Sequence, residues 1–201
     1  MKLIKELLEE AEKENRRGSN FLTDSNKQKL REQWILGKFA ENYNQRATCK
    51  MEYAKVSEAP DFEVFDSEKN WMFDVEITEA LDKGRRRTLE YKTPAKGVIS
   101  IPKTDYFPVI ERLILQKCSK KYPKATVLII YLNVFSSIYD KFASETFSQL
   151  LLPEKCNLSQ IWFLDSGGDK ILQTATSFML RTLSEMSKWG DSKNKKLYEI
   201  I

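Results

Sequence analysis

The feature that most constrains the fold of this 201-residue chain is the apolar run "ATVLIIYLNV" at residues 125–134. The run is rich in β-branched residues and does not alternate with polar ones, which is typical of a strand covered on both faces. A second apolar stretch, "QIWFLD" at 160–165, follows a segment over about 138–151 that has the pattern of a helix. Two buried strands joined through a helix predict a parallel pair with a right-handed crossover.

The region before these strands predicts two helices and an antiparallel meander. Residues 2–16 place apolar side chains at helical spacing, and a second helix is expected from a cap at Asp24 or Ser25 to about Gln45. An extended segment at 47–56 is followed by "DFEVF" and "WMFDVEIT". The polar turn "DSEKN" separates these two stretches, as in a β-hairpin.

The whole pattern predicts an α/β domain with three layers. A mixed central sheet, formed by an antiparallel meander and two parallel strands, is expected between flanking helices. A helix over about 106–121 leads to the buried strands, Glu79 is expected to begin a helix before it, and "SGGDKILQTAT" is expected to add an edge strand. We predict an N-terminal helical extension at 1–22, one domain at 23–180 and a charged tail at 181–201.

Composition excludes several classes of protein. The chain is 41% hydrophobic and 31% charged, as in an ordinary globular domain, and it lacks the roughly eighteen consecutive apolar residues of a membrane span. Its first residues also lack the apolar core and cleavage site of a signal peptide. The three cysteines are isolated and lack metal-site spacing, which favours a cytoplasmic protein without a disulfide framework. They are Cys49, Cys118 and Cys156. The tryptophans expected in the core are Trp34, Trp71 and Trp162.

Missing residue types narrow the chemistry further. The chain has no histidine, so it has no histidine general base, and a Ser-His or Cys-His triad cannot be built. Its seven glycines are scattered and form no phosphate-binding "GxxxxGK" loop. These absences remove many hydrolase and nucleotide-binding classes and direct attention to the carboxylates.

Two carboxylates are expected to meet on the hairpin. Asp61 begins one strand and Glu76 lies near the end of the other, and the fourteen residues between them suffice for two short strands and a turn. Alternation places Glu76 on one face with Asp74 and Thr78. Neighbouring carboxylates repel each other, and Mg²⁺ both relieves that repulsion and suits phosphodiester hydrolysis. The alternative is a solvated hairpin face, and for Asp74 a partly exposed strand acid.

A basic window follows the hairpin. Seven basic residues and one acid fall within 83–103, a local charge of +6 in a chain whose net charge is +4. Such a patch on a near-neutral body is a plausible footprint for phosphate groups, with a solvated helix face as the alternative. Within it, Arg85, Arg86 and Arg87 are the candidates for phosphate binding.

The motif "PDF" at 60–62, followed after a turn by "FDVEIT" at 73–78, resembles the signature of the PD-(D/E)XK nuclease superfamily, which has the restriction-endonuclease-like fold. The predicted order of helices and strands over 24–165 is similar to the common core of that superfamily. The extension "EALDKGRRRTLEYK" also resembles poorly characterised bacterial and phage proteins placed in it.

The resemblance assigns roles to individual residues. Asp61 and Glu76 match the two metal-binding acids, whereas Thr78 stands where the superfamily has its lysine. A lysine there stabilises developing negative charge, so another cation is expected to replace it, with Lys92 and Lys50 as the candidates. The acid that the superfamily often carries on its first core helix corresponds to Glu41 or Glu32, and Glu41 is preferred because it lies nearer the strands in sequence.

The resemblance implies a metal-dependent, endonuclease-like hydrolase that cleaves phosphodiester bonds in DNA with Mg²⁺ or Mn²⁺. Nucleic acid is the expected partner, a membrane is not, and a homodimer is left open. Because the motif lysine is missing, two alternatives stay open. One is a catalytically inactive nucleic-acid-binding or regulatory protein with the same fold, and the other is a protein-interaction module of a phage or mobile element.

Overall fold

The computed structural model describes residues 1–16, 27–81, 107–133, 156–165 and 176–180. The chain divides into two compact units, one made of Met1–Ile77 with Lys83–Lys103 and the other of Thr78–Asp82 with Thr104–Ile201. Over the described residues, the hydrogen-bonded strands follow chain order from β1 to β7 in a mixed sheet. The α/β class and the mixed sheet predicted from the sequence are therefore confirmed.

The first unit is built on an antiparallel meander. The hydrogen-bonded neighbours β1 (Lys2–Leu3), β2 (Tyr53–Val56), β3 (Phe62–Phe65) and β4 (Trp71–Leu81) are antiparallel to one another. The predicted hairpin is thus present. Its turn is closed by Asp66, whose carboxylate accepts bonds from the backbone N–H groups of Glu68 at 2.9 Å and Asn70 at 2.8 Å.

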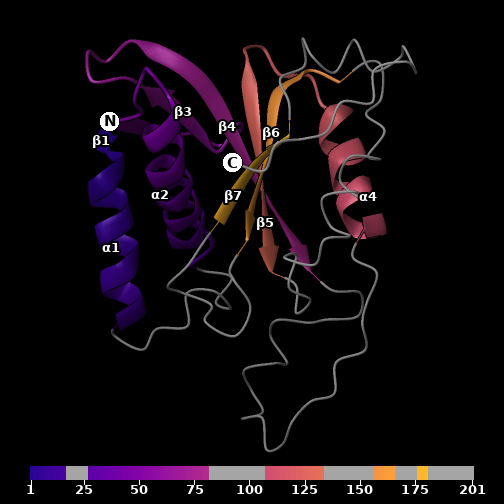
Figure 1. Ribbon diagram of the computed structural model, residues 1–201, viewed down its shortest axis with the longest axis horizontal. Helices are drawn as coiled ribbons and strands as arrows, with labels where there is room; N and C mark the ends of the chain where they lie inside the picture. Colours follow the sequence, from indigo (N-terminus) through magenta and orange to yellow (C-terminus); the bar gives the residue numbers. More distant parts are fainter. Residues whose placement is uncertain (17–26, 82–106, 134–155, 166–175, 181–201) are drawn as a thin grey trace, which may run out of the picture. The chain divides into compact units, whose positions relative to one another are not determined.

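Two helices pack against each other in this unit, α1 (Ile4–Arg16) and α2 (Gln28–Arg46) (Figure 1). The apolar side chains that helical spacing aligns on α1 are all buried, and these are Ile4, Leu7, Leu8 and Ala11. The approach of the helices is close, because a Cβ atom at Gly37 would lie 2.7 Å from Cβ of Leu8. Only glycine fits there without a shift of the neighbouring helix.

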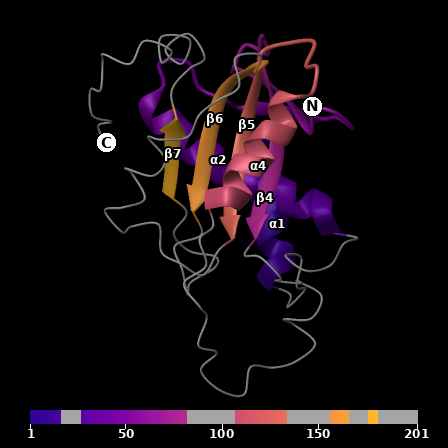
Figure 2. The same ribbon diagram turned by 90° about the vertical axis from the view of Figure 1, so that its right-hand side faces the viewer.

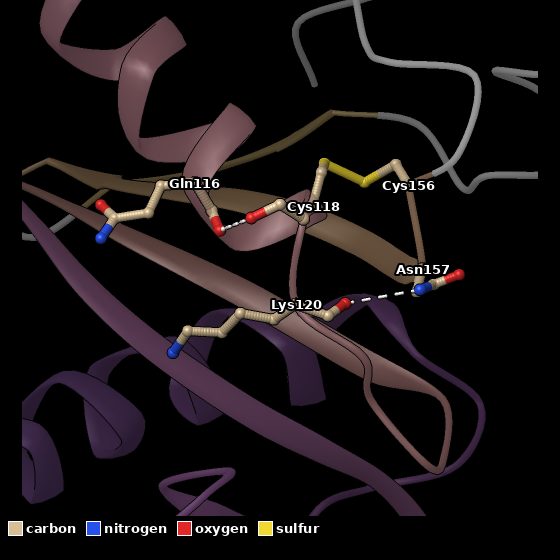
Figure 3. The surroundings of a disulfide bond; sticks show 6 residues. Gln116, Cys118, Lys120, Cys156 and Asn157 are labelled. Carbon is tan, nitrogen blue, oxygen red and sulfur yellow. Dashed lines mark hydrogen bonds between the residues drawn. A yellow bond between two sulfur atoms is a disulfide. The ribbon is translucent and has the colours of Figure 1, made fainter.

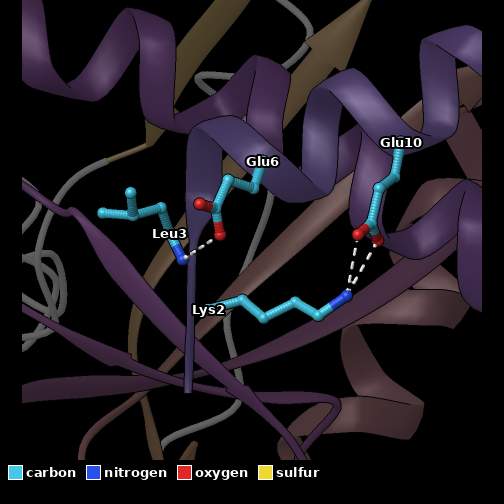
Figure 4. A network of polar contacts seen from close by, with 4 residues as sticks. All are labelled: Lys2, Leu3, Glu6 and Glu10. Carbon is cyan, nitrogen blue, oxygen red and sulfur yellow. Dashed lines mark hydrogen bonds and ion pairs between the residues drawn. The ribbon is translucent and has the colours of Figure 1, made fainter.

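The ends of these helices differ in part from the prediction. α2 begins at Gln28 with Lys27 in the cap position and without a side-chain cap, and the predicted caps Asp24 and Ser25 lie outside the described residues. Ahead of α1, the N–H of Leu3 donates to Glu6 at 3.3 Å, and Lys2 and Glu10 form an ion pair at 2.8 Å (Figure 4). These contacts hold β1 at the start of α1.

The second unit contains α4 (Phe107–Cys118), the parallel strands β5 (Thr126–Asn133) and β6 (Leu158–Asp165), and β7 (Thr176–Leu180), which is antiparallel to β6 (Figure 2). The parallel pair was predicted. The segment "SGGDKILQTAT", in which an edge strand was expected, lies outside the described residues except for Thr176, where β7 begins, and the predicted crossover helix at 138–151 lies outside them as well. Side chains of α4 pack on those of β5 and β6 in one apolar core. Its largest members include Ile110, Ile114, Ile130, Ile161 and Phe163.

Cys118 and Cys156 form a disulfide that joins the end of α4 to the residues just before β6 (Figure 3). The prediction of isolated cysteines is therefore wrong for this pair, because 38 positions of sequence separation conceal a Cα–Cα distance of 4.4 Å. Beside it, Asn157 Nδ2 donates to the backbone oxygen of Lys120 at 3.4 Å. The free cysteine, Cys49, is exposed.

Two further expectations are corrected. β4 continues to Leu81, so Glu79 lies in a strand and does not begin a helix, because the β-ladder extends past the motif. Trp34 and Trp162 are buried as predicted, but Trp71 is 39% exposed. None of the helices in the described part of the chain is long and apolar enough to cross a bilayer.

Candidate functional site

Asp61 is held where the chain enters β3. The N–H of Ser57 donates to the backbone oxygen of Asp61 at 3.0 Å, which closes the loop between β2 and β3. Pro60, immediately before Asp61, has no N–H group and is buried. The loop therefore presents Asp61 in a defined position at the first turn before the strand.

The carboxylate of Asp61 reaches across to β4. Its Oδ2 accepts a hydrogen bond of 2.7 Å from the backbone N–H of Ile77. β3 and β4 pair with Phe62 opposite Val75, so the same register extended by one residue sets Asp61 opposite Glu76. The structure thus brings the two motif acids to adjacent positions on neighbouring strands. The carboxylate also gives the Ile77 N–H an acceptor where the β-ladder ends.

The two acids lie on the side of the hairpin that faces away from α2. Phe62 and Phe73 point toward α2, since the Lys29 Nζ lies 5.7 Å from the Phe62 ring and the Tyr43 and Phe73 rings lie 5.8 Å apart. Alternation then directs Asp74 and Glu76 to the opposite side.

On this opposite side, the carboxylates of Asp74 and Glu76 are buried. Glu76 is 4% exposed and Asp74 is 2% exposed, so the expectation of a partly exposed Asp74 is wrong. Asp74 accepts a hydrogen bond of 2.9 Å from Trp71 Nε1, which explains why this carboxylate can be buried. Burial of Glu76 beside Asp61 is costly while both are charged, and a cation lowers that cost.

The donor set fits a hard divalent cation that keeps part of its water shell. Mg²⁺ in proteins is commonly held by one or two carboxylates together with waters and substrate phosphates. Asp61 and Glu76 supply two such carboxylates. Within the described ranges, no group of three or more His, Cys, Asp or Glu side chains is arranged to hold a metal ion.

Glu41 and Glu32 differ sharply in environment. Glu41 is exposed and pairs with Lys38 at 3.2 Å, and Lys38 also pairs with Glu12 at 3.2 Å. Burial lowers the pKa of Lys38, but the hydrogen bonds to Glu12 and Glu41 outweigh it, so this pKa lies above its usual value. Glu32, by contrast, is 8% exposed and accepts a hydrogen bond of 2.7 Å from Gln28.

The contacts of α2 show that Glu32 lies nearer than Glu41 to the loop of Asp61 along this helix. Lys29, in the first turn, donates to the backbone oxygen of Ser57 at 3.2 Å, in the loop that carries Asp61. The last turn of α2 meets the opposite end of the hairpin, where Asn44 and Met51 are hydrogen-bonded. Glu32 follows Lys29 by one helical turn, whereas Glu41 belongs to the far end.

The residues that could take the place of the missing motif lysine differ in their positions relative to Asp61 and Glu76. Thr78 follows Ile77 in β4 and is partly buried. Lys50 lies beyond the opposite end of β3 from Asp61, because Glu52 N bonds to Phe65 O at 3.1 Å, so Lys50 is not brought to the acids. Lys92 lies outside the described residues, as does the arginine cluster at 85–87. Lys29, which the sequence did not single out, contacts the loop of Asp61.

Comparison with protein-family models, with curated proteins and with solved structures returned no match. The function is therefore inferred from the residues of this chain and their contacts.

Proposed function

We propose that this protein is a metal-dependent nuclease that hydrolyses phosphodiester bonds in DNA, with Asp61 and Glu76 as ligands of Mg²⁺ or Mn²⁺. The observation that carries the proposal is the 2.7 Å bond from the Ile77 N–H to Asp61 Oδ2, next to the buried Glu76. The restriction-endonuclease-like arrangement suggested by "PDF" and "FDVEIT" belongs to the same proposal. A mixed sheet with an antiparallel hairpin that carries both motifs supports it.

The chain's own residues prepare the site in two ways. The Ile77 N–H fixes one oxygen of Asp61, so this carboxylate is oriented before any ligand binds. Burial of Glu76 strengthens its interaction with a cation, because electrostatic interactions are stronger where water is excluded. A bound divalent cation would supply Lewis acidity and a more acidic water molecule.

The cation that replaces the motif lysine is part of the proposal. The hydroxyl of Thr78 can donate a hydrogen bond to a phosphate oxygen but carries no charge. Lys92 is the candidate that remains for this role, and Glu41 and Glu32 remain the candidates for the helix acid.

A second candidate function is a nucleic-acid-binding or regulatory protein without catalysis. The threonine at position 78, where the superfamily has lysine, favours it. In that case Arg85, Arg86 and Arg87 are expected to bind phosphates with no cleavage. Under the protein-interaction alternative, the same arginines meet an acidic partner.

The deciding experiment is a cleavage assay with Mg²⁺ or Mn²⁺ on single- and double-stranded DNA and RNA. We expect cleavage by the parent protein and loss of about a thousand-fold in rate for Asp61→Asn and Glu76→Gln, because several kcal/mol of transition-state stabilisation depend on the metal. Asparagine keeps an acceptor for the Ile77 N–H and so limits damage to the fold. Asp66→Asn is the matched control, since Asp66 also accepts backbone N–H bonds but lies in the turn.

Cleavage that persists in both site variants contradicts the assignment of these acids. Absence of cleavage with retained nucleic-acid binding supports the second candidate. A salt titration then tests the arginines. Replacing Arg85, Arg86 and Arg87 by alanine is expected to reduce the slope of the logarithm of the binding constant against the logarithm of salt concentration by about two units. An unchanged slope removes the phosphate role of the cluster.

A further inference from the structure

One face of the antiparallel meander carries a row of large apolar side chains that pair with one another across its strands. Leu3 of β1 pairs with Tyr53 of β2, Tyr53 with Phe65 of β3, and Phe65 with Trp71 of β4. We refer to these four residues as the aromatic row. Residues directly opposite each other on adjacent strands lie side by side on one face, so the row extends across the meander from β1 to β4.

The row lies on the side of the sheet that carries the candidate acids. The register shifts by one residue between Val64 and Phe65, so that Phe65 pairs with Trp71 and not with Met72. This bulge turns Trp71 away from the α2 side, where strict alternation from Phe73 would have put it. The bond from Trp71 Nε1 to Asp74 Oδ1 confirms that the indole is on the face of Asp74 and Glu76.

The side chains of the row are accessible and cations flank them. Trp71 is 39% exposed and Leu3 36% exposed, while Tyr53 and Phe65 are partly buried. Lys69 Nζ lies 5.5 Å from the Tyr53 ring centroid. Next to the row, the exposed Lys55 pairs with Glu63 at 3.0 Å. Flat aromatic surfaces beside ammonium groups are the elements with which proteins bind unpaired nucleotides.

The distance from the row to the acids suits a nucleic-acid strand. Phe65 and Asp61 are four residues apart along an extended chain, which corresponds to about 13 Å at about 3.3 Å per residue. A stacked strand advances about 3.4 Å per nucleotide, so about four nucleotides cover this distance. A nucleic-acid strand that stacks on the aromatic row can therefore reach Asp61 and Glu76 while it stays on the same face of the sheet.

We propose that the aromatic row binds unpaired bases of single-stranded nucleic acid and guides the strand toward Asp61 and Glu76. The guidance rests on the proposed nuclease function, but base stacking on the row does not. Flanking cations and the shared face with the acids favour a nucleic-acid strand over a second copy of the chain or a peptide.

The test measures binding separately from cleavage. Fluorescence anisotropy follows a labelled oligothymidine of about 16 nucleotides, the upper end of single-domain site sizes, and a duplex of equal length, both in EDTA. Trp71→Ala is expected to weaken single-strand binding about ten-fold, which corresponds to one lost stacking contact. Trp71→Phe keeps an aromatic ring and is expected to stay within about two-fold of the parent. Leu115→Ala, at an apolar residue of α4 that is 45% exposed, is the control for general surface effects.

The outcomes separate the alternatives. Equal losses in Trp71→Ala and Trp71→Phe would assign Trp71 to its hydrogen bond with Asp74 and overturn the proposal. Three other outcomes would also overturn it: unchanged single-strand binding in Trp71→Ala, an equal loss of single-strand and duplex binding in that variant, and self-association seen in sedimentation that Trp71→Ala abolishes. If Trp71→Ala weakens single-strand binding as expected and the parent does not cleave, the nuclease function fails while the aromatic row stands.

Discussion

The two units bury different kinds of side chain. In the first unit, the described residues with a buried carboxylate are Glu32, Asp74 and Glu76. In the second unit, the buried polar groups of the described core are hydroxyls: that of Thr126 donates to the backbone oxygen of Lys124 at 3.0 Å, and that of Tyr131 is buried as well. Apolar burial stabilises a fold, whereas buried carboxylates cost free energy unless they are paired or bind a cation.

The difference indicates a division of roles. The apolar side chains of β5, β6 and α4 account for the stability of the second unit. Asp74 and Glu76 lie two residues apart on β4, and an uncharged side chain at Glu76 would serve stability better. Retention of a buried charge beside a second carboxylate is typical of functional sites.

The largest stability effect is expected in the second unit. Ile130 is fully buried, so Ile130→Ala removes apolar contacts and leaves a cavity, at a cost of about 4 kcal/mol in the free energy of unfolding. Denaturant unfolding measures this loss. The exposed Leu115→Ala is the control, and a loss as small as the control's would contradict the role given to this core.

Reduction of the Cys118–Cys156 disulfide is expected to have the second-largest effect on stability. The bond spans 38 positions, and its loss frees the unfolded chain at a cost of about 3 kcal/mol. Thermal unfolding with and without a reductant measures the change. Cys156→Ser is expected to unfold at the same temperature as the parent protein with its disulfide reduced, and adding reductant should not change that temperature. If the reductant does not change the unfolding temperature of the parent either, the disulfide contributes no stability.

Glu76→Gln is expected to act in the opposite direction. Without a metal ion, removal of the charge relieves its repulsion with Asp61 and stabilises the protein by about 1 kcal/mol. Unfolding in EDTA measures the gain, with Glu68→Gln in the exposed turn as the control. A clear loss of stability would mean that the carboxylate of Glu76 is structural, and the contrast between the units would then fail.

The smallest effect concerns the hairpin turn. Backbone hydrogen bonds from Asn70, with further bonds from its side chain and from Glu68, hold the pKa of Asp66 below its ordinary value. A lowered pKa in the folded state means that the stabilisation is present above the unfolded pKa and lost as pH falls through the folded one. The protection of the Glu68 and Asn70 amides, relative to the intrinsic exchange rate at each pH, is therefore expected to fall only in acid. The same fall in Asp66→Asn would contradict this cause.

Much of the fold could be predicted because it follows from local patterns. The run at 125–134 and the stretch at 160–165 gave the parallel pair, and the alternation in "WMFDVEIT" gave the hairpin. The pairing of Asp61 with the end of β4 also followed, since hairpin register depends on the turn between the strands.

The rest depends on contacts that are distant in sequence. The disulfide brings together two cysteines that no spacing rule pairs, and the exposure of Trp71 results from a bulge that strict alternation cannot foresee. The contact of Lys29 with the loop of Asp61 could not be foreseen either, because it depends on how α2 lies along the hairpin, which is a tertiary feature.

The central claim, that Asp61 and Glu76 bind a divalent cation, is tested most directly by calorimetric titration with Mn²⁺. The account predicts binding by the parent and by Asp66→Asn, and an affinity at least about ten-fold lower in Asp61→Asn and in Glu76→Gln, as expected for a lost ligand. Equal Mn²⁺ affinity in the parent and both site variants would contradict it.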